Sequence, residues 1–474
     1  MLTISKTHQR MGPIYATVGI TLALWLGSKG YYGDVFSDPY KYPAKAASLS
    51  ATVLMCWGVL LSARLRPLER FFGGLDKVYQ VHKRIGRWAF FVILFHPLLL
   101  SAHNLPDLSA FLLEMGFRQP AGNRYLWGQN VGVAALLFMA ALMILTLYRK
   151  LPYHRWKRTH EGFGLVLFLV AAHVLVVDRD VSAYPLLAIW MYGLLILALG
   201  SAVYMRFLYR FWGPRFPYAV SDLSRQGDIL HLTLRPDKEA MDFRPSQFVY
   251  LVVHKEGITP EPHPYSIACG YNLERQIKLG IKAAGDHTRT LGSLETGDRV
   301  TLYGPYGHFS DPFLSGERDC VFIAGGIGIT PFMGMWHVAL HSEERLEKRD
   351  VPERLRRLHP EIIKSWKSPR VHLFYVCRNP EDAGFDADIR REVTSSRFHG
   401  FRALEERGHH YELYLTSKQG RMTAAYVNER IPRGVMNKTV FLCGPSPMVA
   451  SLIGQLHGLG VEDRRIVVED FNLV

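Results

Sequence analysis

The sequence predicts a membrane protein of three parts: an all-α bundle of six transmembrane helices, an antiparallel β-barrel, and a doubly wound α/β domain. The mean hydropathy is +0.02 although 21% of the residues are charged, as expected of an average over two unlike parts. Long apolar runs end near residue 207, and a soluble pattern follows. At 474 residues the chain is too long for one ordinary domain. We expect domains at 1–212, 213–314 and 315–474.

The first part contains apolar segments separated by polar loops. Several approach the ~20 residues that a helix needs to cross a hydrocarbon core of ~30 Å. The segments are 13–28, 46–63, 85–102, 130–148, 161–177 and 184–207. The first and the fifth are short, but all six are expected to span the bilayer.

The net charge of +14 raises the possibility of a nucleic-acid partner. The basic residues, however, flank the apolar segments, in the loops after the second, fourth and sixth. Basic loops mark the cytoplasmic side of a membrane protein. We therefore expect no nucleic-acid partner, both termini in the cytoplasm, and a location in the plasma (inner) membrane. No removable signal peptide is evident.

The five cysteines are scattered and form no C-x-x-C pair. We expect neither a disulfide framework nor a structural zinc site. Four of the five lie in the soluble-looking half, which fits a reducing compartment.

The soluble part changes its pattern near residue 320. Before it, short alternating strands such as "HLTLRP" and "SQFVYLVV" favour a small antiparallel barrel. After it, apolar strands such as "CVFIAGG", "VHLFYVC", "YELYLT" and "TVFLCG" alternate with helical stretches, which favours a parallel sheet. The charged insert 341–370 is interpreted as a solvated helical excursion without chemistry.

Four histidines occupy the membrane part at matched spacings. His82 and His96 are fourteen residues apart, and His160 and His173 are thirteen apart. Both spacings correspond to roughly 20 Å along a helix. Fourteen residues keep one helix face, whereas thirteen require a bulge or kink, for which Gly162 and Gly164 are candidates.

The expected topology makes the third and fifth helices run in the same direction. His82 and His160 then lie at the cytoplasmic level, and His96 and His173 at the outer level. A single membrane histidine is usually a packing residue, but ionisable groups at such depth are costly and tend to be functional. Two imidazoles at each level are what a six-coordinate, electron-transferring haem needs. His103 has no matching partner and is expected near a membrane surface.

Four stretches of the soluble half are candidates for cofactor chemistry. "HPYSIA" from His263 and "KAAGDHTRTL" from Lys282 suit a flavin and a pyrophosphate, although each alone also fits ordinary barrel strands. "AGGIGITPFMG" follows an apolar strand and precedes a helix, so its glycines allow a pyrophosphate to approach the helix N-terminus. "FLCGPSPM" ends another parallel strand, where ligands bind.

With these stretches in this order, the chain resembles the ferric reductase and NADPH oxidase superfamily from about residue 45 onward. The resemblance implies a six-helix, two-haem membrane domain followed by a ferredoxin-reductase-like dehydrogenase. The implied cofactors are FAD, two haem b groups and NADPH, with NADH also possible. The implied haem-iron ligands are His82, His96, His160 and His173.

The resemblance also assigns residues in the soluble half. The flavin motif matches His263, Pro264, Tyr265 and Ser266, together with Gly285 and Thr288; the adjoining Lys282 and Arg289 complete the flavin candidates. The nucleotide motifs match Gly325, Gly326, Gly328, Thr330, Pro331, Cys443, Gly444 and Pro445. Phe471 resembles the aromatic residue that covers the flavin ring.

Two arginines follow neighbouring strands of the expected parallel sheet. Arg378 follows "HLFYVC" and matches a family arginine associated with NADPH, and Arg421 follows "YELYLT". Arginine suits the 2′-phosphate of NADPH because its fork donates two hydrogen bonds. Glu381 and Asp382 lie close enough to blunt the preference, so we expect a modest bias toward NADPH.

The chain departs from the family pattern where the acceptor is expected. Animal oxidases carry a further histidine at the position of Leu100, although His103 lies nearly one turn beyond. Lys45 occupies the place of a family basic residue. Lys45, His103, Cys443 and Phe471 are the catalytic candidates.

The expected function is electron transfer from cytoplasmic NADPH to an extracytoplasmic acceptor, with dioxygen giving superoxide. A ferric-chelate reductase and an electron-transfer subunit that feeds a periplasmic partner protein are the alternatives. The lipid bilayer is the expected surrounding, and protein partners are not predicted.

Overall fold

The computed structural model describes residues 10–31, 38–147, 151, 153–270, 275–347, 369–396 and 400–469. The chain divides into two compact units, Met1–Phe211 and Trp212–Val474. Most of the predicted insert 341–370 lies outside the described residues, but its first residues continue a helix. Phe471 also lies outside the described residues.

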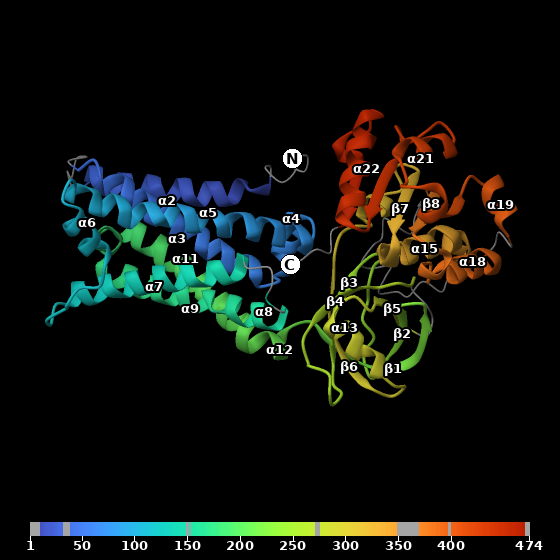
Figure 1. Ribbon diagram of the computed structural model, residues 1–474, viewed down its shortest axis with the longest axis horizontal. Coiled ribbons are helices and arrows are strands. Elements are labelled where there is room, and N and C mark those ends of the chain that lie inside the picture. Colours follow the sequence, from blue (N-terminus) through green and yellow to red (C-terminus); the bar gives the residue numbers. More distant parts are fainter. Residues whose placement is uncertain are drawn as a thin grey trace. The chain divides into compact units, whose positions relative to one another are not determined.

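Unit 1 is a bundle of long helices joined by shorter ones (Figure 1). The long helices are α2 (Gly12–Tyr31), α3 (Lys41–Ser62), α5 (Leu75–Ser101), α7 (Arg124–Leu147), α9 (Phe163–Val177) and α11 (Pro185–Val203). The shorter ones are α4 (Arg66–Phe72), η1 (Ala102–Asn104), α6 (Leu108–Met115), α8 (Tyr153–Glu161), α10 (Arg179–Ala183), η2 (Tyr204–Leu208) and α12 (Tyr209–Trp212).

Five helical stretches are long and apolar enough to cross a membrane. They are Lys41–Ser62, Leu75–Asn104, Arg124–Leu147, Arg155–Val177 and Pro185–Trp212. Their outward faces expose large apolar side chains such as Leu137, Ile144 and Ile196, as expected of helices that face lipid. Helix α2 has 20 residues but is not one of the five, so the predicted count of six spans is not confirmed.

The predicted irregularity in the fifth segment is confirmed. Helix α8 ends at Glu161, Gly162 forms a turn, and α9 begins at Phe163. The amide of Gly162 donates to the carbonyl of Thr159 at 3.0 Å, a tighter turn than the α-helix allows. This turn changes the angular register between His160 and His173, whose thirteen-residue spacing does not fit an uninterrupted helix.

The first half of unit 2 is a six-stranded antiparallel sheet. Its strands are β1 (Arg215–Gln226), β2 (Ile229–Pro236), β3 (Phe248–Val253), β4 (His263–Ser266), β5 (Ile277–Lys282) and β6 (Arg299–Tyr306), in the order β4-β3-β6-β1-β2-β5. An isolated bridge pairs Ile267, directly after β4, with Leu279 of β5. The antiparallel prediction is confirmed, whereas closure into a barrel is not. The connections include α13 (Asp286–Thr290), η3 (Leu291–Ser293) and α14 (Asp311–Leu314).

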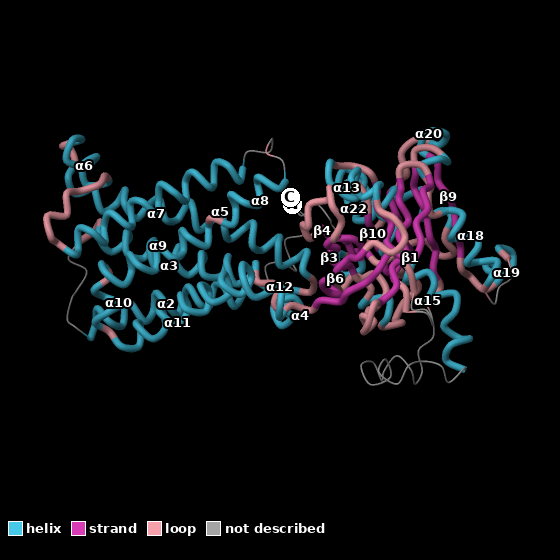
Figure 2. Tube along the Cα trace, turned by 90° about the horizontal axis from the view of Figure 1, so that it is seen from below, coloured by secondary structure: helices cyan, strands magenta, loops and turns pink. Residues whose placement is uncertain are grey.

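The second half of unit 2 is a five-stranded parallel sheet (Figure 2). The strands are β7 (Cys320–Gly325), β8 (Val371–Cys377), β9 (His410–Leu415), β10 (Thr439–Cys443) and β11 (Ile466–Glu469), in the order β11-β10-β7-β8-β9. The four predicted strands are β7 to β10, and β11 was not predicted.

Helices cover both faces of this parallel sheet. Successive residues of one strand, such as Phe322 and Ile323 of β7, belong to two separate apolar clusters, one on each face of the sheet. One cluster includes α15 (Thr330–Glu347) and α18 (Asp386–Ser395), and the other includes α21 (Ala424–Arg430) and α22 (Ser446–Gly458). The doubly wound prediction is therefore confirmed. The remaining elements are η4 (Gly326–Ile329), η5 (Pro380–Asp382), α19 (Phe401–Glu406), α20 (Thr416–Gln419) and η6 (Asp463–Arg465).

Candidate functional site

Helix α5 carries two of the four predicted iron-binding histidines and packs against α3. Nδ1 of His82 lies 2.8 Å from the carbonyl oxygen of Gly58, and Nδ1 of His96 lies 2.9 Å from that of Ala44. The two acceptors on α3 are fourteen residues apart, like the two histidines. The same helix face therefore repeats the same contact at two levels.

Helices α8 and α9 carry the other two histidines and pack against α7. Nδ1 of His173 lies 2.8 Å from the carbonyl oxygen of Gly128. Nδ1 of His160 lies 3.3 Å from the hydroxyl oxygen of Thr146, a longer contact. The His160 ring also stacks on Trp156, with centroids 4.9 Å apart and planes 18° apart.

The carbonyl partners determine which ring nitrogen carries the proton. A carbonyl oxygen only accepts, so Nδ1 of His82, His96 and His173 must donate. Nε2 is then the basic nitrogen of each neutral ring. Histidines that ligate a metal characteristically donate their other N–H to a carbonyl or carboxylate, which fixes the tautomer and the ring orientation. The donor set therefore fits iron ligation.

Two of the four histidines lie against each other. The ring centroids of His82 and His160 lie 5.8 Å apart. His96 lies on α5 like His82, and His173 lies on α9, which follows α8 and His160. Each predicted pair therefore has the two imidazoles that would hold a haem iron.

Two glycines that the sequence analysis did not select bring α7 close to His173. A Cβ on Gly132 would lie 2.6 Å from Nδ1 of His173, and one on Gly128 would lie 2.6 Å from the side chains of Val176 and Val177. Gly128 and Gly132 form a G-x-x-x-G pattern, which lets membrane helices approach closely. The pattern was visible in the sequence as "GQNVG".

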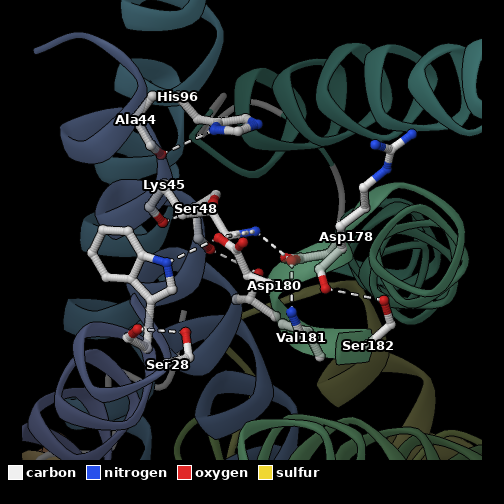
Figure 3. A network of polar contacts seen from close by, with 12 residues as sticks. Ser28, Ala44, Lys45, Ser48, His96, Asp178, Asp180, Val181 and Ser182 are labelled. Carbon is white, nitrogen blue, oxygen red and sulfur yellow. Dashed lines mark hydrogen bonds and ion pairs between the residues drawn. The ribbon is translucent and has the colours of Figure 1, made fainter. Parts of the chain in front are cut away.

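Lys45 lies in a cluster of ion pairs beside His96 (Figure 3). Its ammonium pairs with Asp178 and lies 3.8 Å from Asp180. Asp180 also accepts from Lys29 at 2.7 Å and from the indole of Trp25 at 3.0 Å. Ala44, whose carbonyl holds His96, is the neighbour of Lys45, so the cluster adjoins this histidine pair.

The charges in this cluster compensate one another. Burial alone would raise the pKa of Asp180, but Lys29, Lys45 and Trp25 together lower it. Asp180 therefore stays ionised at neutral pH. The other outer candidate, His103, lies apart from these groups: its Nε2 is 3.4 Å from Glu114 and its side chain is 54% exposed.

The flavin candidates lie on β4 and on the loop after β5. The Tyr265 hydroxyl is buried without a hydrogen-bond partner among the described residues, and burial raises its pKa. A buried donor of this kind fits a ligand acceptor atom. The His263 ring stacks on His287 with centroids 3.7 Å apart. The Thr288 hydroxyl accepts from the amides of Ala284 and Gly285, so it shapes its own loop.

The nucleotide loop after β7 packs against the loop after β10. A Cβ on Gly325 would lie 2.7 Å from Met448, and one on Gly328 would lie 2.5 Å from the carbonyl oxygen of Cys443. Gly326, in contrast, has a left-handed φ of +54° and open space around it. The structure thus attributes Gly325 and Gly328 to close contact between two loops and leaves Gly326 with room for a ligand.

The remaining candidates of this half occupy strand ends and turns. Arg378 directly follows β8, Arg421 follows β9 and α20, and both are exposed. Because β8 and β9 are neighbours, the two arginines occupy one edge of the sheet. Lys282 ends β5 and lies 3.4 Å from Asp228. Thr330 begins α15, and its hydroxyl donates to the carbonyl oxygen of Ile327. A Cβ on Gly280 of β5 would lie 2.9 Å from the side chain of Thr330.

Comparison with protein families gives three matches along the chain. Residues 47–171 match the ferric reductase like transmembrane component, residues 218–310 match a FAD-binding domain, and residues 322–452 match the oxidoreductase NAD-binding domain. The three matches fall on the helical bundle, the antiparallel sheet and the parallel sheet, respectively.

Three of the relatives are distant and match about half of the chain. Anthranilate 1,2-dioxygenase electron transfer component of Acinetobacter baylyi is 24% identical over 51% of this chain and 62% of its own length. Cytochrome b5 reductase 4 of Rattus norvegicus is 27% identical over 40% of this chain and 32% of its own length. The FAD/NAD-binding domain of nitric oxide dioxygenase from Vibrio cholerae is 21% identical, with a TM-score of 0.41, over 54% of this chain and 98% of that chain.

Proposed function

We infer that the chain belongs to the ferric reductase and NADPH oxidase-like fusions and is an oxidoreductase, because three family models match it one after another. We propose that it carries electrons from cytoplasmic NADPH, through FAD and two b-type haems, to an acceptor on the other side of the membrane. The domain boundaries that we propose are 1–212 for the haem domain, 213–314 for an FAD-binding barrel and 315–474 for the nucleotide-binding domain.

The observation that supports this proposal most strongly is the hydrogen bonding of the membrane histidines. Three of the four donate Nδ1–H to a helix carbonyl, so Nε2 is the basic nitrogen. The four histidines come from helices that pack in two pairs, and the rings of His82 and His160 lie 5.8 Å apart. A packing role would not require the same tautomer three times, whereas axial ligation of iron would.

The cofactor-binding residues follow from the same geometry. His82 with His160 and His96 with His173 would hold the haems. Tyr265, Ser266 and the Thr288 loop would hold the flavin, and the Gly326 loop with the Cys443 loop would receive the nicotinamide nucleotide. When bound, these groups supply hydride acceptance and single-electron transfer. The chain's own contribution is to orient them and to keep the path buried.

We propose six spans, with both termini in the cytoplasm. Helix α2 supports this count because three tryptophan hydrogen bonds fix it within the bundle. Trp57 donates to Thr17 at 2.7 Å, Trp190 donates to Thr21 at 2.8 Å, and Trp25 of α2 donates to Asp180. The basic loops after α3 and α7 support the orientation.

We propose dioxygen as the acceptor. Lys45 and Lys29, the cations of the ion cluster beside His96, are paired with Asp178 and Asp180. They offer no free positive charge to an anionic ferric chelate, whereas a small neutral acceptor needs none. Lys45 and His103 remain the candidates for contact with the acceptor.

The products distinguish the acceptors. Full-length protein in liposomes, given NADPH on the dehydrogenase side, should reduce a superoxide probe on the opposite side, and superoxide dismutase should abolish that signal. Without oxygen, a ferric chelate with a ferrous trap should give a much lower rate. A faster anaerobic ferrous rate would show that the protein is a metalloreductase. Rates with both acceptors that are no higher than those of His173→Ala would contradict transmembrane transfer.

A further inference from the structure

Two histidines and a glutamate meet at a place that the electron-transfer machinery does not use. His337 and His341 lie one turn apart on α15, and Glu392 lies on the facing helix α18. One carboxylate oxygen of Glu392 contacts Nδ1 of His337 and lies 2.8 Å from Nε2 of His341. The three potential ligand atoms lie within 4.8 Å of one another.

The surroundings of this cluster suit a metal ion better than an ordinary surface pair. The side chains are only 20%, 14% and 27% exposed, for His337, His341 and Glu392 respectively. One carboxylate oxygen of Glu392 lies between the two imidazoles, so one carboxylate and two ring nitrogens are already gathered at one point. A cation could bind to these three groups together.

We propose that His337, His341 and Glu392 bind one zinc ion that links α15 to α18. Two histidines at positions i and i+4 of a helix present their rings on one face, and two imidazoles with one carboxylate are an established donor set for zinc. Three protein ligands leave a fourth position for water. This proposal is independent of the proposed electron acceptor.

The cysteine spacing led us to expect no structural zinc site, but this site contains no cysteine. Cys269 lies nearby, since its carbonyl oxygen would be 2.7 Å from a Cβ on Gly334 of α15. The Cys269 thiol contacts the backbone of Gln276 and Lys278 and is not one of the three gathered ligand groups.

The position of the site indicates what the metal would do. Helix α15 begins at Thr330, directly after the nucleotide loop, and His337 packs against Gly270, which follows the flavin motif. A metal between α15 and α18 would therefore restrain the helix that borders both parts of unit 2. Zinc would stabilise the dehydrogenase without touching substrate or cofactor.

The test is zinc binding to the full-length, tag-free protein after dialysis against a chelator. Competition with a chromogenic zinc indicator should give about one zinc per chain, and added zinc should raise the melting temperature of the flavin-containing unit by a few degrees. His341→Ala and Glu392→Gln should each lose the bound zinc and the shift while retaining flavin. The matched control is His457→Gln, because His457 pairs with only one carboxylate, Asp463, at 2.7 Å.

Each result decides the matter. Loss of zinc in both ligand variants but not in His457→Gln supports the site. Equal zinc binding by the ligand variants and the control, or no stoichiometric zinc on the unaltered protein, overturns it.

Discussion

The two histidine pairs of the bundle are held differently. In the His96–His173 pair, both Nδ1 atoms donate to helix carbonyls, at 2.9 and 2.8 Å. In the His82–His160 pair, only His82 does so, and His160 has a 3.3 Å contact with the Thr146 hydroxyl and a stacked Trp156. A helix carbonyl cannot rotate away from its partner, but a hydroxyl can. Backbone carbonyls therefore fix the ring orientation in the His96–His173 pair, whereas side chains fix part of it in the His82–His160 pair.

The largest expected effect is the loss of a ligand. His173→Ala should remove the haem of the His96 pair and leave the other, because each pair uses its own histidines. Haem content, measured by pyridine haemochrome, should fall from about two to about one per chain. His103→Ala is the control, since His103 lies outside both pairs and should leave the content unchanged. Full haem content in His173→Ala would refute the assignment.

The ion cluster lies beside the His96 pair, so breaking its ion pairs should destabilise this end of the helical bundle. Lys45→Met leaves Asp178 without its main cation in a mostly buried setting, which costs about 3 kcal/mol. Thermal unfolding of the purified protein should show the loss as a lower Tm.

The same cluster predicts a pH dependence. Lys29, Lys45 and Trp25 hold the pKa of the Asp180 carboxyl below its ordinary value, although burial opposes this. Its stabilising contribution is therefore present above that value and lost as pH falls through the folded pKa. The gap in Tm between the unaltered protein and Lys45→Met should narrow in acid. A gap that widens in acid would contradict the pairing.

A smaller effect is expected from crowding one histidine. Gly132→Ala places a methyl group 2.6 Å from Nδ1 of His173, so the ring must shift from its carbonyl. Loss of the hydrogen bond that orients a metal ligand typically weakens metal binding about tenfold or more. The matched control is Gly58→Ala, where a Cβ has no neighbour within 4 Å, although this residue also supports a histidine. Haem should be lost on dilution faster from Gly132→Ala than from the unaltered protein, and no faster from Gly58→Ala. Equal rates of loss from the two variants would contradict this explanation.

The smallest effect is expected from Thr146→Val, which removes the longer contact to His160. Stacking on Trp156 remains, so haem content should stay near two per chain and the haem midpoint potential should shift slightly. Potentiometric titration measures that shift. Loss of the haem in Thr146→Val would show that the two levels do not differ in the way described.

Much of this arrangement follows from the sequence, but the supports of the ligands do not. Spacing was enough to select the four histidines and to require a break in the fifth segment, because helix geometry converts residue numbers into depth and direction. It left both Gly162 and Gly164 as candidates for the break. The acceptors at Gly58, Ala44 and Gly128 could not be predicted, since a backbone carbonyl is present at every residue. The pairing of Lys45 with Asp178 also escaped prediction, because it joins helix α3 to the turn between α9 and α10, far apart in sequence.

The loops of unit 2 show a similar limit. The glycine-rich stretch after β7 was predicted as a nucleotide loop, but the pattern alone could not separate glycines that face a ligand from those that face another loop. Gly328 touches Cys443, whereas Gly326 has open space. The zinc site escaped because His341 and Glu392 are fifty-one residues apart and only the fold brings them together.

The most direct test of the central claim is the anaerobic visible spectrum of the full-length protein before and after addition of NADPH. We predict a six-coordinate, low-spin haem spectrum at about two haems per chain, with both haems reduced by NADPH at the rate at which the flavin turns over. A protein that bleaches its flavin with NADPH but leaves the haem oxidised, or that contains no haem, would contradict the account.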